Sequence, residues 1–197
     1  MKKVLYVGLE APRRDDVCVI HCPLIEVVPK RGRELKDISR ASHVIVTSKT
    51  AVACIKEERV WDKAFISVGK ATTGALLRAG ARCVETAVNE CQEGIIELLE
   101  TMQFENPLFF WGHSSRSRPL ILDYLHEKGY RLISCVLYET HFKEPEQALA
   151  LETVDEIHFT SPSTVEAFFH FFGPPPKRAT LHTQGPITQK CLSSLSS

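Results

Sequence analysis

The sequence predicts an α/β protein with two similar units, each a doubly wound parallel sheet that has helices on both faces. Short apolar runs alternate with stretches of helical periodicity from Glu34 onward, as in parallel sheets covered by helices. Two different strand-to-helix turns also occur twice, in the same order along the chain. Helix capping can explain a single turn, but it does not explain why two different turns recur in the same order. The recurrence therefore indicates two copies of one arrangement.

The first repeated turn places hydroxyl residues directly after an apolar strand. Its two copies are Thr47-Ser48, and Thr160-Ser161-Pro162-Ser163. After the second copy, apolar residues at positions 165, 168, 169 and 172 have the spacing of one buried helix face. A serine can cap such a helix and proline suits its first turn, so an ordinary helix start is the alternative interpretation.

The second repeated turn is Gly-x-x-Thr. Gly69 and Thr72 form one copy, and Gly185 and Thr188 form the other. Each copy follows a predicted strand and begins a predicted helix, so both turns lie where the free N–H groups of a helix N-terminus attract anions.

The remaining elements follow from apolar periodicity and from turn residues. Strands are expected at residues 3–7, 17–20, 43–46, 64–68, 82–84, 107–111, 130–138, 156–160 and 179–182. Helices are expected at residues 48–59, 70–79, 91–103, 117–128, 161–172 and 186–195. Gly80 and Gly129 come directly after two of these helices, where glycine favours termination.

The order of elements predicts a discontinuous domain. Residues 1–25 and 143–197 are expected to form a terminal domain, and residues 36–135 a middle domain. Segments 26–35 and 136–142 are expected to be linker strands, because a proline-bounded extended stretch can pair with the long strand that ends near Tyr138.

Composition excludes several functional classes. The chain of 197 residues has 24 Lys plus Arg against 24 Asp plus Glu, so no overall field favours nucleic acid or an acidic membrane. No apolar run approaches the roughly 18 residues of a membrane span. We expect a cytoplasmic monomer that binds neither nucleic acid nor membrane.

The seven cysteines include no Cys-x-x-Cys pair, and reduced thiols are expected. Cys18, His21 and Cys22 are the nearest approach to a metal motif, but on a strand His21 faces away from the two cysteines. No metal site is predicted, and the eight histidines show no metalloprotease spacing.

The candidate functional residues are hydroxyls on predicted strand-to-helix turns. They are Thr47, Ser48, Thr72, Ser114, Ser115, Ser161, Ser163 and Thr188. In a parallel sheet such turns lie at the carboxyl edge, where ligands bind, and they can hold carboxylates or phosphates without a cofactor. Gly69-Lys70 does not complete a phosphate-binding loop, since Ala64 and Ala71 replace two required residues.

In its motifs and their order, the sequence resembles the uroporphyrinogen-III synthase family. The resemblance rests on the two repeated turns, on Gln92-Glu93-Gly94 at a helix start, on Pro23-Leu24-Ile25 and on Tyr138-Glu139-Thr140. It implies two flavodoxin-like domains joined by a two-stranded linker. It also implies a cofactor-free lyase that cyclises hydroxymethylbilane, a linear tetrapyrrole with eight carboxylates, by loss of water and inversion of the last ring through a spiro intermediate.

The resemblance assigns roles to individual residues. Tyr138 matches a tyrosine thought to assist departure of the hydroxyl, and packing on a domain is the alternative role. The residues expected to bind substrate are Thr47, Ser48, Gly69, Thr72, Ser114, Ser161, Pro162, Ser163, Gly185 and Thr188. Many hydrogen-bond donors of moderate strength suit a flexible polyanion, because they hold its carboxylates while the rings rearrange.

Two departures from the family leave the function open. The segment before Pro23 has no room for a full helix after the first strand, where Gly8-Leu9 replaces the usual Thr-Arg, and the chain stops after the helix that follows Gly185. We therefore expect a reduced terminal domain. The alternatives are an inactive paralogue, a module that binds a small anion, or a sugar-phosphate isomerase-like domain, which would need a Glu or His base near the turns.

Overall fold

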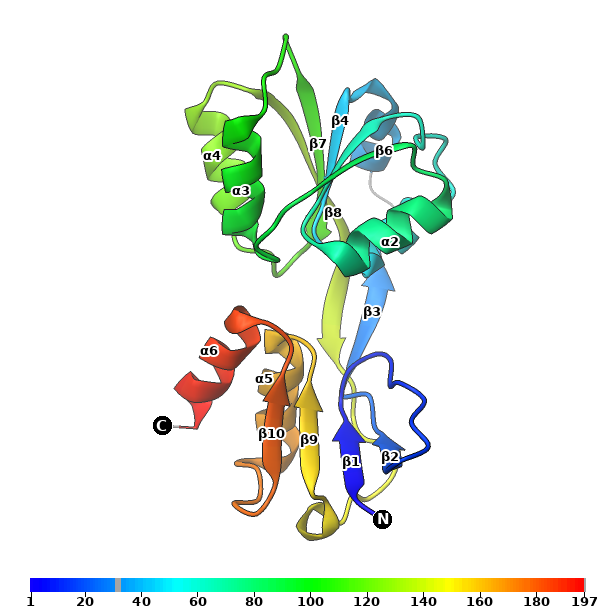
Figure 1. Ribbon diagram of the computed structural model, residues 1–197, viewed down its shortest axis with the longest axis vertical. Coiled ribbons are helices and arrows are strands. Elements are labelled where there is room, and N and C mark those ends of the chain that lie inside the picture. The colour runs from blue at the N-terminus through cyan, green and yellow to red at the C-terminus, as the bar shows by residue number, and fades with distance from the viewer. Residues whose placement is uncertain (31–32, 197) are drawn as a thin grey trace. The chain divides into compact units, whose positions relative to one another are not determined.

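The computed structural model describes residues 1–30 and 33–196, so Arg31 and Gly32 of the expected first linker segment lie outside the described residues. The chain divides into two compact units (Figure 1). We call Met1–Val27 with Thr140–Ser197 the terminal unit, and Val28–Glu139 the middle unit. In the described part of the chain, every helix is too short or too polar to cross a bilayer.

The larger sheet has the strand order β3-β8-β7-β4-β5-β6. Its strands are β3 (Ile25–Pro29), β4 (His43–Val46), β5 (Ala64–Ser67), β6 (Cys83–Thr86), β7 (Leu108–Ser114) and β8 (Arg131–Phe142). Neighbours from β8 to β6 are parallel. Strand β3 runs antiparallel to β8, since the N–H of Lys30 donates to Leu137 and that of Lys143 donates to Leu24.

Helices cover both faces of the parallel strands in the middle unit (Figure 1). They are α1 (Lys49–Cys54), α2 (Lys70–Ala79), α3 (Gln92–Thr101) and α4 (Leu120–Glu127). Ile45 and Phe109 of the sheet pack against the α3 and α4 face. Alternate side chains such as Val44 and Phe110 are equally buried on the other face. Burial on both faces explains why these strands read as continuous apolar runs.

The terminal unit joins strands from the two ends of the chain. Its sheet has the order β10-β9-β1-β2, with β1 (Lys3–Tyr6), β2 (Cys18–His21), β9 (Glu156–Phe159) and β10 (Thr180–Thr183). All three pairings are parallel. Helices α5 (Pro162–Phe172) and α6 (Pro186–Leu195) cover one face. Residues 7–17, between β1 and β2, contain no helix, and the opposite face carries a small cluster around Val4, Tyr6 and Val17.

The α/β class with parallel sheets is confirmed, and the repeated turns occupy matching places in the two sheets. The Thr-Ser turns follow β4 and β9, and the Gly-x-x-Thr turns follow their neighbours β5 and β10. On the other side of β4 and β9 lie β7 and β1. The middle unit adds one parallel strand, β6, at its edge.

Four elements differ from the sequence prediction. Helix α1 ends at Cys54 rather than near residue 59, because the following Lys56-Glu57-Glu58 run is polar and offers no face for burial. A 3-10 helix, η1 (Arg33–Arg40), and a shorter one, η2 (Leu151–Thr153), were not expected. Residues 136–142 are not a separate strand but the end of the 12-residue β8.

Candidate active site

Three of the predicted residues meet at the carboxyl edge of the middle sheet. Ser48 follows β4, Ser114 ends β7 and Tyr138 lies on β8, and β7 is the neighbour of both other strands. The hydroxyl oxygens of Ser48 and Tyr138 are 3.0 Å apart, and Ser114 also forms a hydrogen bond with the phenol. The strand order reverses between β4 and β7, which is where doubly wound sheets bind ligands.

Ser48 has two roles. Its Oγ accepts a hydrogen bond from the N–H of Ala51 at 3.0 Å, so it caps α1. The cap uses one lone pair of the hydroxyl, which leaves the proton and a second lone pair for Tyr138. The capping interpretation is therefore correct for Ser48, and the contact with Tyr138 is additional to it. Thr47, directly before Ser48, is half-buried.

Tyr138 is held in a protonated, well-fixed state. Only 9% of its surface is exposed. Burial raises the pKa of its phenol, and the hydrogen bonds with Ser48 and Ser114 oppose that rise only in part. A register irregularity between His113 and Ser114 brings Ser114 opposite Tyr138, and such irregularities redirect side chains. The phenol is thus a neutral hydrogen-bond donor at physiological pH.

A carboxylate of the chain itself occupies the N-terminus of α2. The N–H of Lys70 donates to Oε1 of Glu90 at 3.0 Å. A Cβ on Gly69 would lie 2.5 Å from Cγ and Cδ of that glutamate. Gly69 has extended backbone, with φ of 170°, so a Cβ here would conflict with the present position of the Glu90 side chain and not with the backbone conformation. The turn therefore has the geometry to bind a carboxylate.

A pocket of about 540 Å³ lies beside this turn. It is lined by Lys70, Thr73, Gly74, Leu77, Thr86, Ala87, Val88 and Glu90. Thr73 Oγ1 is 2.8 Å from Ser67 Oγ and 2.7 Å from Thr86 Oγ1. The predicted residue, Thr72, is buried with 4% of its surface exposed. Sequence reasoning thus selected the neighbour of the threonine that lines the pocket.

The hydroxyl turn of the terminal unit is a complete helix cap. Ser161 Oγ accepts from the N–H of Thr164, and Thr164 Oγ1 accepts from the N–H of Ser161. Ser163 Oγ lies 2.9 Å from Ser161 Oγ, and Pro162 takes the first helical position. At the end of β1, a Cβ on Gly8 would overlap Oγ1 of Thr160. Glycine at position 8 thus lets β1 approach this turn.

The second Gly-x-x-Thr turn uses its glycine differently. Gly185 precedes α6 with a φ of +82°, which favours glycine, and a Cβ there would meet nothing within 4 Å. Thr188 is 2% exposed and donates to the carbonyl of Gln184. The threonines of both turns, Thr72 and Thr188, are therefore packed inside their units, and the outward donors of these turns are backbone N–H groups.

His113 has partners that the sequence did not reveal. Its ring nitrogens lie 2.8 Å from the carbonyl oxygen of Ser114 and 2.9 Å from Ser134 Oγ. The ring stacks on Trp111 at 4.1 Å, and burial lowers its pKa. His113 is therefore neutral and fixed, so it orients the strand end that carries Ser114.

The Gln92-Glu93-Gly94 motif positions the start of α3. Arg118 donates to both carboxylate oxygens of Glu93, at 2.6 and 2.7 Å, and this bond lowers the pKa of Glu93 to about 2. A Cβ on Gly94 would overlap the carbonyl oxygen of Asn89. Gln92 is 8% exposed. The motif thus fixes the helix to the loop after β7.

A parallel sheet whose carboxyl edge carries a hydroxyl cluster and helix N-termini is typical of α/β proteins that bind anionic ligands at that edge. A family model described as uroporphyrinogen-III synthase HemD matches residues 10–196. The chain belongs to the uroporphyrinogen-III synthase family, the cyclising lyases of haem biosynthesis. A comparison with curated proteins found no match.

Solved structures share the fold. The uroporphyrinogen-III synthetase of Helicobacter pylori matches with a TM-score of 0.70 and 18% identity, over 100% of this chain and 90% of that one. A mutant uroporphyrinogen III synthase from Thermus thermophilus matches with a TM-score of 0.66 and 17% identity, over 99% and 89%. The wild-type Thermus protein gives 0.57 and 19% over the same shares.

Proposed function

We propose that the chain carries out its family's reaction at the carboxyl edge of the middle sheet. In that reaction hydroxymethylbilane loses its terminal hydroxyl as water, its last ring is inverted, and the macrocycle closes to uroporphyrinogen III. The observation that carries the proposal is the protonated phenol of Tyr138, held 3.0 Å from the hydroxyl of Ser48.

The phenol suits the first step because a hydroxide ion is a poor leaving group. A hydrogen bond or proton from Tyr138 to the terminal hydroxyl lets the carbon–oxygen bond break with water as the product. The raised pKa keeps the proton on the phenol until it is needed. Ser48 and Ser114 hold the ring in place, and the proton that the substrate loses when the macrocycle closes restores the phenol.

The substrate carboxylates need donors rather than a cofactor. We assign them to the N–H groups at the starts of the helices, where Gly69 and Gly185 precede α2 and α6. The contact between Glu90 and Lys70 supports this assignment, since it shows a carboxylate held by such an N–H group. Thr47, Ser161, Pro162 and Ser163 remain proposed contacts, and Thr72 and Thr188 support their turns from inside.

Tyr138→Phe tests the proposal. The change removes the proton donor and keeps the ring, so kcat should fall severalfold or more, while the product remains type III and Tm changes little. General acid assistance is commonly worth about a hundredfold, but a pyrrole carbinol loses its hydroxyl readily and water can substitute.

Tyr124→Phe is the matched control, because Tyr124 lies on α4 of the same unit and is partly exposed. Its rate should equal that of the wild type. An unchanged rate for Tyr138→Phe would remove the phenol from the mechanism. A wild-type protein that yields only type I product would show that the chain is not a synthase.

A further inference from the structure

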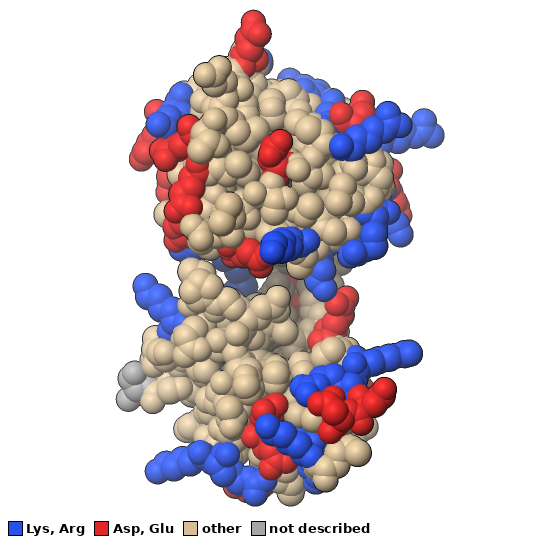
Figure 2. Space-filling model, viewed as in Figure 1, with Lys and Arg blue, Asp and Glu red and all other residues tan. Residues whose placement is uncertain are grey.

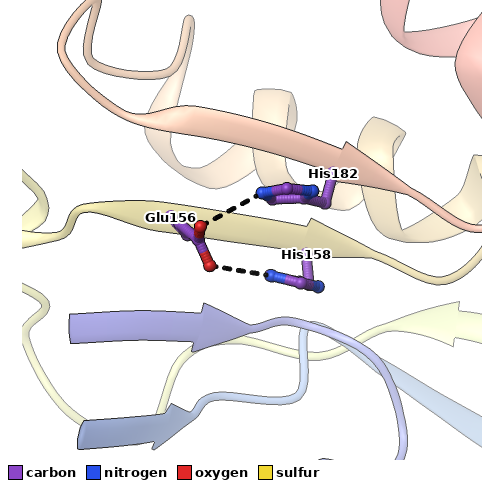
Figure 3. A group of neighbouring side chains, drawn as sticks. All are labelled: Glu156, His158 and His182. Atoms are coloured by element: carbon purple, nitrogen blue, oxygen red, sulfur yellow. Dashed lines mark hydrogen bonds and ion pairs between the residues drawn. The ribbon is translucent and has the colours of Figure 1, made fainter. Parts of the chain in front are cut away.

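A compact group of side chains of the kinds that bind metals lies on the terminal sheet, whereas Tyr138 and its partners Ser48 and Ser114 are in the middle unit. His158 on β9 and His182 on β10 are register partners, and Glu156 precedes His158 by two residues on the same face (Figure 3). This is the face opposite α5 and α6, because the alternate residues Ile157 and Phe159 pack in the helix-covered core.

The donor atoms are already close to the spacing that a metal requires. Glu156 presents Oε1 at 3.3 Å from Nε2 of His182 and Oε2 at 3.4 Å from Nε2 of His158. One donor atom from each residue can be chosen so that all lie within 4.8 Å of one another. Ligand atoms on a tetrahedral zinc ion, with bonds of about 2.0–2.1 Å, are roughly 3.3 Å apart.

The group is held in place before any ion arrives. The imidazoles of His158 and His182 stack with centroids 4.5 Å apart and planes 20° apart. Tyr6, the register partner of His158 on β1, packs on the other side of that ring at 4.5 Å. Three parallel strands thus fix the rings, so binding costs little side-chain entropy.

The types of donor atom favour a transition-metal ion. Two imidazole nitrogens and one carboxylate oxygen form a set that suits zinc and similar ions, whereas calcium and magnesium prefer oxygen ligands alone.

Lys2 is the group that a metal ion must displace. Its ammonium lies 2.5 Å from Oε1 of Glu156, and its side chain is 52% exposed, so it can turn into solvent. Arg14, another cation whose charge acts on His158, is engaged by Asp16 at 2.5 Å. A divalent ion would replace the lysine as the counter-charge of Glu156.

We propose that Glu156, His158 and His182 form a zinc-binding site on the face of the terminal sheet opposite α5 and α6. Zinc there links β9 to β10, and it stabilises the terminal unit because it binds the folded sheet alone. Three protein ligands leave a fourth position for water.

The test is titration of tag-free, chelator-treated protein with zinc and with cobalt. We expect saturable binding of one ion per chain and a rise in Tm with zinc. The cobalt complex should show the visible absorption of tetrahedral coordination without a thiolate charge-transfer band, since the ligands are nitrogen and oxygen.

Three variants locate the site. His182→Ala and Glu156→Gln should each weaken binding by at least about tenfold, and Lys2→Ala should strengthen it. Two controls, His126→Ala on α4 and Cys18→Ser on β2, should bind as the wild type does. Equal affinity of His182→Ala and the wild type, a thiolate band, or an unsaturable isotherm would overturn the proposal. Circular dichroism of each variant checks that the sheet is folded.

Discussion

At the scale of the residue, the proposed chemistry depends on a tyrosine whose surroundings come from three strands. Tyr138 is placed by β8, and its partners Ser48 and Ser114 lie at the ends of β4 and β7. Each serine alone has a local explanation, because one caps a helix and the other accepts the N–H of Arg116. Their convergence on one phenol is the feature that local capping does not explain.

Two glycines of the middle unit should respond differently to the same substitution. In Gly94→Ala the new methyl group overlaps the backbone oxygen of Asn89, which cannot move away without shifting the start of α3. We expect a loss of about 2 kcal/mol, typical of overpacking. In Gly69→Ala the obstacle is the side chain of Glu90, which can swing out, so the loss should be clearly smaller.

The measurement is the urea midpoint of tryptophan fluorescence, since both tryptophans, Trp61 and Trp111, lie in the middle unit. Gly129→Ala is a third variant for comparison, because its strain comes from a φ of +69° rather than from a neighbour. Equal losses for Gly94→Ala and Gly69→Ala would mean that the close approach of Asn89 carries no energetic weight.

The limits of sequence reasoning are clear at this scale. The Gly-x-x-Thr pattern located the turns but pointed to Thr72, because spacing does not show which of two adjacent threonines faces outward. The group of Glu156, His158 and His182 was missed for a different reason. Two of its members share a strand at the i, i+2 spacing, but the third depends on the pairing of β9 with β10, and register is not visible in a single sequence.

At the scale of the element, most of the proposed substrate contacts lie at the starts of helices. Ser48, Gly69, Ser161 and Gly185 are the residues directly before α1, α2, α5 and α6. A helix start offers unpaired N–H groups and a partial positive charge. Local sequence predicted all four starts, because capping residues and glycines act within one turn of the chain. The end of α1 was predicted less well, since it depends on burial.

The ion pair that ties α3 to the loop after β7 should give the middle unit a dependence on acid. The pKa of Glu93 is about 2 in the folded chain and its ordinary value is 4.5, so the pair stabilises the fold above about pH 4.5. That contribution disappears as the pH falls toward 2. Because both side chains are partly exposed, it should amount to about 0.5–1 kcal/mol.

Glu93→Gln should therefore lower the urea midpoint of tryptophan fluorescence at pH 7 and differ little from the wild type near pH 2.5. Glu97→Gln on the same helix is the control, since its carboxylate bonds to the neutral side chain of Asn89. A gap between Glu93→Gln and the wild type that is constant with pH would show that the pair contributes no charge-dependent stability.

At the scale of the whole molecule, the recurrence of two turns in the sequence corresponds to a recurrence of strand order in space. In the middle unit, β4 precedes the Thr-Ser turn and lies between β7 and β5, which precedes the Gly-x-x-Thr turn. In the terminal unit, β9 lies in the same way between β1 and β10. Alternation of elements predicted the class of fold, because a parallel sheet demands it. The charges of both signs are scattered over the visible surface of each unit (Figure 2), as the balanced composition predicts.

The two units should differ in stability because their sheets differ in size and in how fully their faces are buried. The middle unit buries both faces of the parallel strands in a six-stranded sheet, whereas the terminal sheet has four strands and its main core on the face of α5 and α6. A smaller buried core contributes less free energy to offset the conformational entropy that is lost on folding, so the free energy of unfolding is smaller. We expect urea to unfold the terminal unit first, so that far-ultraviolet circular dichroism falls before tryptophan fluorescence changes.

A pair of core substitutions assigns each transition to its unit. Phe168→Ala removes a fully buried ring between α5 and the terminal sheet, and it should shift only the early change in circular dichroism, by about 3 kcal/mol or more. Leu125→Ala removes a fully buried side chain of α4, and it should shift the tryptophan transition. Because no tryptophan lies in the terminal unit, the fluorescence midpoint of Phe168→Ala should match that of the wild type. If the two probes change together in the wild type, and Phe168→Ala lowers both midpoints equally, the units unfold as one and the difference in their layers does not govern stability.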